Sequence, residues 1–175
     1  WSSDVCSSDL ITAITPRGPA YRGRPAVELA AAGTPFENVA ELLWGGYLPA
    51  SPIGWPRAAL PHAELARLLG PAPRPPLDAM PLVVQLAALA DPDRDDPRPD
   101  ALIACGRRLI PQLAAALAPG ASPAAMTRAL GAPRIAQIAA RALGVADEHA
   151  GLIDAALVLL ADHELNASSF TARVA

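Results

Sequence analysis

The sequence contains no lysine and has no excess of positive charge. All 14 basic residues are arginines, and they stand against 17 acidic residues in a chain of 175, which gives a formal net charge of −3. Nucleic-acid binding needs clustered basic residues that neutralise phosphates. The charge balance therefore predicts a protein with no nucleic-acid-binding surface.

Aromatic residues are also scarce. They make up 4% of the chain, whereas 40 residues are alanine and 20 are proline. Sandwiches and barrels of β-strands depend on β-branched and aromatic residues, whereas alanine favours helices that proline interrupts. The composition predicts an all-α fold of short helices, and 175 residues correspond to about one domain.

Long apolar segments and secretory features are missing. The longest apolar run, Leu152 to Ala161, is interrupted by Asp154 and is too short to cross a membrane. The N-terminus has neither the basic region nor the apolar region of a signal peptide. Cys6 and Cys105 can form at most one disulfide. We therefore predict a cytoplasmic protein that does not bind a membrane.

The first ten residues, WSSDVCSSDL, differ in composition from the rest of the chain and contain the near-repeat SSDV and SSDL. They resemble the translation of a sequencing-library adapter over their whole length. We predict that residues 1–10 are a non-native tail and that residues 11–175 are a partial domain. The alternative is a disordered natural N-terminus. Removing Asp4 and Asp9 from the 17 acidic residues leaves 15 against 14 basic ones, a net charge of −1.

Apolar residues spaced by three and four predict helices along most of the chain. Proline at first helical positions and glycine at helix ends set the expected boundaries. The predicted helices are Pro25 to Ala32, Pro35 to Trp44, His62 to Leu69, Leu77 to Ala90, Asp100 to Ala118, Ser122 to Gly131, Pro133 to Leu143 and Asp147 to Asn166. No segment reads as a convincing strand. The sequence therefore predicts an all-α bundle of seven or eight helices.

Finer expectations follow for individual helices. Thr34 and Glu37 have the spacing of a capping box for the second helix, and Asp100 is expected to cap the fifth. Cys105 is expected to be a small core residue. The inward faces of two helices are expected to consist of Leu82, Val83, Leu86 and Leu89 in the fourth, and Leu152, Ile153, Ala156, Leu157 and Leu160 in the last.

Most motifs that carry chemistry are absent. The sequence has no Cys-x-x-Cys pair, His-Glu-x-x-His motif, phosphate-binding loop or dinucleotide fingerprint. The three histidines are His62, His149 and His163, and the first two are expected on the surface. None has a second histidine three or four positions away, so the sequence predicts no metal site.

His163 is the main candidate for function. It lies in Asp162-His163-Glu164-Leu165-Asn166, directly after the most apolar segment. Burying such polar groups costs free energy unless they are paired or bind a ligand. A histidine beside carboxylates can contact an anionic substrate or act as a general acid or base. Equally, these side chains can form a polar network at a helix end. A triad with Ser168 or Ser169 lacks a nucleophile elbow.

Two segments together resemble the citrate synthase family. The first contains Tyr21-Arg22-Gly23 and continues through Pro35 to Pro49, ending in Gly46-Tyr47-Leu48-Pro49. It is similar to the family's Tyr-Arg-Gly element and the helix after it. The second, Ala161 to Arg173, begins Ala-Asp-His-Glu-Leu-Asn-Ala-Ser and is similar to the family's Ala-Asp-His-Glu-x-Asn-Ala-Ser element.

The resemblance implies the incomplete large helical domain of an acyltransferase that condenses acetyl-CoA with oxaloacetate to citrate. It implies a homodimer in the full-length protein, with no cofactor besides the co-substrate acetyl-CoA. The family histidine that contacts oxaloacetate corresponds to His163, and Asn166 corresponds to an asparagine that shapes the same pocket. The family's remaining catalytic residues follow downstream, starting with Gly-Pro-x-His-Gly. We therefore assign no catalytic residue here, and we expect an N-terminal fragment that is inactive by itself.

Two other functions remain open. A 2-methylcitrate synthase would use propionyl-CoA, and the residues that distinguish one methylene are not evident. A non-catalytic binding or regulatory domain is the other alternative. It is suggested by departures from the family pattern: Pro75-Pro76-Leu77-Asp78 stands in place of His-Pro-Met-Asp, and Leu160 replaces a histidine.

Overall fold

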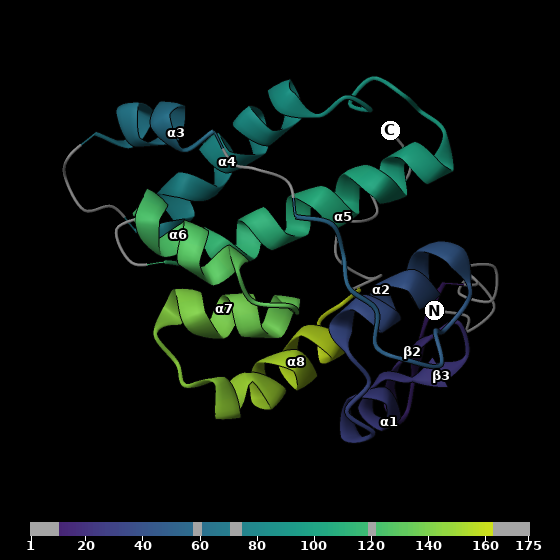
Figure 1. Cartoon of the computed structure of the whole chain (residues 1–175). Helices are drawn as coiled ribbons and strands as arrows, with labels where there is room; N and C mark the ends of the chain where they lie inside the picture. Colours follow the sequence, from purple (N-terminus) through teal and green to yellow (C-terminus); the bar gives the residue numbers. More distant parts are fainter. Residues whose placement is uncertain (1–10, 58–60, 71–74, 119–121, 163–175) are drawn as a thin grey trace. The chain divides into compact units, whose positions relative to one another are not determined.

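The computed structural model describes residues 11–57, 61–70, 75–118 and 122–162. The chain divides into two compact units, of which unit 1 comprises residues 1–53 and 154–175 and unit 2 comprises residues 54–153. The described ranges contain eight α-helices, a 3-10 helix and three short strands (Figure 1). The predicted all-α class is confirmed. No helix in these ranges is long and apolar enough to span a membrane.

Unit 1 begins with a small antiparallel sheet that the sequence analysis missed. Its strands are β1 (Thr12–Thr15), β2 (Gly18–Tyr21) and β3 (Arg24–Pro25), in the order β1-β2-β3. Thr12 pairs with Tyr21, and Tyr21 pairs in turn with Arg24. The prediction of no strand was wrong because buried and exposed residues do not alternate along these strands, so the usual signal of period two is absent.

Two helices complete the first part of unit 1. They are α1 (Ala26–Ala31) and α2 (Phe36–Gly45). α2 ends as predicted, since Gly46 has a φ of 75° and donates its N–H to the Leu42 carbonyl at 2.9 Å; this left-handed conformation favours glycine. The core of the unit consists of Tyr21, Ala26, Leu29, Val39, Leu42, Leu43 and Val158.

The predicted capping box at the start of α2 was wrong. The N-cap residue is Pro35, so Thr34 lies one position outside the cap and makes no side-chain capping bond. Glu37 is buried within the helix. The N–H of Phe36 instead donates to the carboxylate of Asp154 at 2.9 Å. A distant residue therefore provides the capping acceptor that we expected from the local sequence.

The remaining helices begin in unit 2. They are α3 (His62–Leu69), α4 (Pro76–Ala90), α5 (Pro99–Ala115), α6 (Pro123–Leu130), α7 (Ile135–Leu143), the 3-10 helix η3 (Asp147–His149) and α8 (Ala150–Leu159), which continues into unit 1. Prolines occupy the first positions of α4, α5 and α6; of these three helices, the sequence predicts a proline at the start of α6 alone, and α4 and α5 begin one residue earlier than the predicted Leu77 and Asp100. Within unit 2, α5 packs against α4, α6 and α7.

Several details of unit 2 differ from the expectation. The N-cap of α5 is Arg98, so Asp100 lies in the first turn and does not cap the helix. Its carboxylate still lies where the helix dipole favours negative charge. Val83 is fully buried in α4, but Leu89 is exposed. Cys105 is half-buried and not part of the core.

The burial of α8 is the largest departure. Its buried residues are Ala150, Asp154 and Val158, whereas Leu152 is 74% exposed and Leu160, just after the helix, is 68% exposed. The prediction put the leucines inward and treated Asp154 as an interruption of the apolar run. That prediction was wrong because the Asp154 carboxylate binds the start of α2, so this face of the helix points inward.

Candidate functional site

The first sheet and the end of α8 meet through two side-chain hydrogen bonds. Thr12 Oγ1 in β1 donates to Asp162 Oδ2 at 2.5 Å. Tyr21 Oη in β2 donates to the carbonyl of Leu159 at 3.1 Å. Ala161 also packs against the core of unit 1. These contacts bring the segment that contains Tyr21-Arg22-Gly23 to the first residues of the Ala-Asp-His-Glu segment.

Tyr21 is a fixed part of this junction. Its side chain is fully buried, and it shares the core with Val158 of α8. Burial raises the pKa of Tyr21 above its ordinary value, and the negative charge of Asp162 raises it further. The phenol therefore stays protonated around neutral pH and keeps its role as a donor.

Arg22 links the same turn to the end of α2. It is the one non-glycine residue of the described ranges with a positive φ, at 46°. Its Nε and Nη2 atoms donate to the Leu43 carbonyl at 3.1 and 2.8 Å. A Cβ on Gly46 would lie 3.7 Å from the guanidinium carbon of Arg22. The positive charge thus lies at the C-terminal end of a helix, where the dipole favours it.

Asp154 supports the other end of α2. Its side chain is 7% exposed and accepts the Phe36 N–H, one of the donors that a helix leaves unsatisfied at its start. A negative charge is also favoured at a helix N-terminus. Because Asp154 lies in α8, this bond connects α8 to α2 within unit 1. The polypeptide leading to Asp162 is therefore held at both ends, by α2 and by the first sheet.

Asn38 organises the loop after α2. Its Nδ2 donates to the carbonyls of Pro49 and Ser51 at 3.0 and 2.9 Å, and its Oδ1 accepts the Ile53 N–H at 3.2 Å. Asn38 is buried, so these bonds replace the water that its amide gives up. The single side chain fixes the segment that begins with Gly46-Tyr47-Leu48-Pro49.

The last described residue, Asp162, comes directly before the predicted binding residue His163. His163 and Asn166 lie outside the described residues, as do Cys6, Ser168, Ser169 and the side chain of His62. The roles assigned to His163 and Asn166 stay predictions. His149 lies on the surface as predicted, with its Nε2 3.6 Å from Glu148 Oε1. Within the described ranges, no group of acidic, cysteine or histidine side chains is arranged to hold a metal ion.

Sequence reasoning missed the residues that build the junction. Thr12 lies outside every motif and Asn38 lies in the first family-like segment without an assigned role, and their partners lie 150 and up to 15 positions away along the chain. Asp154 did give a signal, because a carboxylate within an apolar helix needs a buried partner. That partner is the start of α2, which the sequence alone does not identify.

Comparison with known protein families identifies the family of this chain. The family model described as citrate synthase, C-terminal domain, matches residues 2–175. The chain therefore belongs to the citrate synthase family. A search of curated proteins gave no match. The family match includes most of the segment 1–10, and the non-native origin of that segment stays a prediction.

Proposed function

We propose that this chain is the substrate-binding part of a citrate synthase that condenses acetyl-CoA with oxaloacetate. The observation that carries the proposal is the pair of hydrogen bonds from Thr12 and Tyr21 to Asp162 and Leu159. Because Thr12 pairs with Tyr21 in the sheet, these bonds bring the start of the first family-like segment close to the start of the second. Membership of the citrate synthase family supports the reaction type.

In the proposed reaction, the acetyl methyl group loses a proton and its carbon bonds to the ketone carbon of oxaloacetate, while the ketone C=O becomes a C–O single bond whose oxygen takes up a proton. Water then hydrolyses the thioester, which releases citrate and the free thiol of CoA. His163 would donate a hydrogen bond to a carboxylate of oxaloacetate, a charge-assisted contact when the imidazole is protonated. Asn166 would shape the same pocket. The junction fixes Asp162, the last described residue before them, and this supports the proposed roles of both.

The test uses the enzyme that contains this chain together with the family's downstream catalytic residues. His163→Ala should raise the KM for oxaloacetate about 10- to 100-fold, since a hydrogen bond to a charged group contributes about 1.5–3 kcal/mol. Thiol release from acetyl-CoA gives the rate. His149→Ala is the matched control because His149 is exposed, and it should leave KM unchanged.

Unchanged KM and kcat in the His163→Ala enzyme would contradict the assigned role. The 175-residue chain by itself should release no thiol from acetyl-CoA with oxaloacetate. Comparing kcat/KM for acetyl-CoA and propionyl-CoA distinguishes the citrate from the 2-methylcitrate reaction. Absence of both reactions in the longer enzyme would favour the non-catalytic alternative.

A further inference from the structure

Unit 2 contains a cavity whose lining includes none of the residues of the candidate site. It has a volume of about 380 Å³ and is lined by α4, α5 and the loop between them. Val84, Ala87 and Leu109 provide an apolar wall, and Gln112 and Cys105 provide polar atoms. A mostly apolar pocket with a few polar groups is the usual form of a small-molecule site.

Gln112 is the feature that points to a ligand. Its side chain is 2% exposed, and its Oε1 atom has no hydrogen-bond partner among the described residues. A buried acceptor without a partner is destabilising. Because Gln112 lines the cavity, a molecule in the cavity that carries an N–H or O–H group can supply the missing donor.

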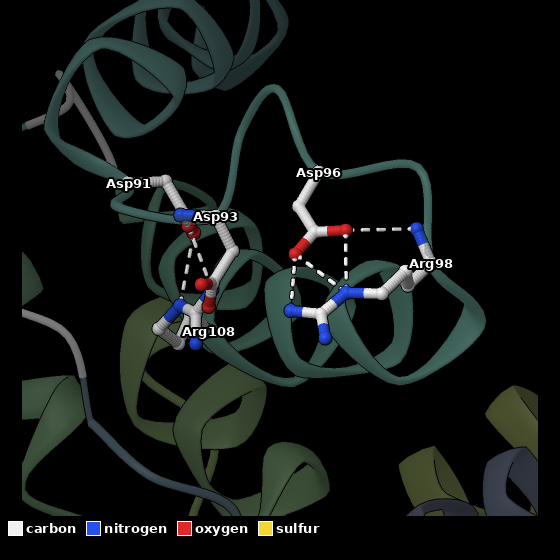
Figure 2. A network of polar contacts seen from close by, with 5 residues as sticks. All are labelled: Asp91, Asp93, Asp96, Arg98 and Arg108. Atoms are coloured by element: carbon white, nitrogen blue, oxygen red, sulfur yellow. Dashed lines mark hydrogen bonds and ion pairs between the residues drawn. The ribbon is translucent and has the colours of Figure 1, made fainter.

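The charge beside the cavity selects the kind of molecule. Arg108 donates from Nη2 to Asp91 Oδ1 at 2.6 Å and to Asp93 Oδ2 at 2.7 Å, and from Nε to Asp91 Oδ2 at 2.9 Å (Figure 2). One guanidinium thus faces two carboxylates, and the cluster has a net charge of −1. The Asp91 side chain is 7% exposed and the Asp93 side chain is 38% exposed, so solvent screens the charge of Asp91 less than that of Asp93.

The separate pair formed by Asp96 and Arg98 does not alter that charge. Arg98 Nη2 lies 2.6 Å from Asp96 Oδ2, and Figure 2 shows the two residues paired with each other, apart from Arg108. The Arg98 side chain is 80% exposed, so this pair contributes little beyond the loop. Arg108 is the basic residue that lines the cavity, and its guanidinium already donates hydrogen bonds to the carboxylates of Asp91 and Asp93.

The thiol of Cys105 is an uncharged group in the lining of the cavity. Burial raises the pKa of its thiol, and the negative charge of Asp91 raises it further. The thiol therefore remains protonated near neutral pH and contributes no negative charge. The acceptor at Gln112, the acidic cluster and the apolar wall together favour a cation with an alkyl chain over an anion.

We propose that this cavity binds a short primary alkylammonium ion, whose chain lies against Val84, Ala87 and Leu109 and whose N–H group donates to Gln112 Oε1. The acids at Asp91 and Asp93 favour its positive charge. The ligand class differs from the acidic substrates of the proposed reaction, and the inference does not depend on that reaction.

Binding of n-hexylammonium chloride to the full 175-residue chain tests the proposal by isothermal titration calorimetry. n-Hexanol and sodium hexanoate serve as probes of equal chain length with a neutral and a negative head group. The ammonium ion should bind at least 10-fold more tightly than hexanoate, with hexanol between them. Equal binding of the three probes, or no binding of the ammonium ion, would overturn the proposal.

Two variants locate the binding. Gln112→Leu removes the acceptor and should reduce hexylammonium affinity about 10- to 100-fold, the loss of one hydrogen bond to a charged group. Gln137→Leu is the matched control, because Gln137 in α7 also has a buried Oε1 without a partner among the described residues but does not line the cavity. It should leave the affinity unchanged. Equal losses in both variants would show that the cavity is not the site.

A third variant covers the case in which Gln112→Leu fails to fold. Asp93→Asn removes one negative charge from a side chain that is 38% exposed, so the fold should tolerate it. It should lower the preference for hexylammonium over hexanoate by at least 3-fold. An unchanged preference would contradict the role of the acidic cluster.

Discussion

Asp154 illustrates how one side chain can stabilise two helices. Its carboxylate is almost completely buried and accepts the N–H of Phe36, so the residue that interrupts the apolar sequence of α8 also caps α2. A buried carboxylate is tolerated only where donors compensate for the lost water. The start of a helix supplies both donors and a favourable dipole.

Replacing Asp154 should therefore destabilise unit 1. Asp154→Ala should lower the free energy of unfolding by about 1–2 kcal/mol, the usual cost of losing a capping side chain. Asp154→Asn keeps a carbonyl oxygen at the same position and should lose less. Urea unfolding followed by circular dichroism measures both, with Glu148→Ala as an exposed control. Wild-type stability in Asp154→Ala would contradict the capping role.

At the scale of elements, short segments depend on side chains that come from elsewhere. α2 receives Asp154 at its start and Arg22 at its end, and the loop after it is held by Asn38. α2 has ten residues, and isolated helices of that length are marginal in water. Contacts at its two ends therefore contribute much of what keeps this helix in place.

Arg22 permits a paired test of such a contact. Arg22→Ala removes two hydrogen bonds to the Leu43 carbonyl and keeps a side chain at a φ of 46°. It should cost about 1–3 kcal/mol of unfolding free energy. Arg22→Gly removes the same bonds but relieves the left-handed backbone, so it should be more stable than the alanine variant by about 1 kcal/mol. Equal stability of the two variants in urea would show that the backbone stores no strain.

The elements also show what the sequence can and cannot predict. The boundaries of α3, α4 and α6 follow from local signals, namely a proline near the start and a glycine or acidic loop at the end, and they agree with the structure within one or two residues. The three strands pair locally but lack alternating burial, and the inward face of α8 depends on partners far along the chain. Local periodicity contains no information about such partners, so Thr12, Asn38 and Asp154 were not recognised as structural residues.

For the candidate site, the sequence identified the two segments but not how they meet. The resemblance to the citrate synthase family indicated Tyr21-Arg22-Gly23, and the same resemblance together with the polar run after an apolar segment indicated Asp162-His163-Glu164. Their junction depends on hydrogen bonds between residues 150 and 138 positions apart. Local sequence does not specify contacts of that range, which are set by the packing of the complete unit.

At the scale of the whole molecule, stability should fall at both extremes of pH for different reasons. The hydrogen bonds from Arg108 hold the pKa of Asp91 below its ordinary value, and burial holds the pKa of Tyr21 above its own. A lowered carboxyl pKa gives stability that is present above the unfolded value, about 3.9, and is lost as pH falls further. A raised phenol pKa gives stability that is present below about 10 and is lost as pH rises.

Urea unfolding between pH 2 and 11 tests this expectation. Asp91→Asn should lower stability at pH 7 and flatten the loss between about pH 4 and 2. Tyr21→Phe should flatten the loss above about pH 10, at the cost of its hydrogen bond to Leu159. If Asp91→Asn does not change the loss of stability at low pH and Tyr21→Phe does not change the loss at high pH, other groups control the pH dependence.

The division of unit 1 into two segments has a consequence for synthesis on the ribosome. Residues 1–53 emerge first, but Val158, Leu159 and Asp162, with which they form their core and hydrogen bonds, are made only after all of residues 54–153. Unit 2, by contrast, is continuous along the chain. Its helices can therefore pack while Tyr21 and Phe36 still lack their partners, and the nascent chain must keep its first apolar residues from associating until α8 has left the exit tunnel.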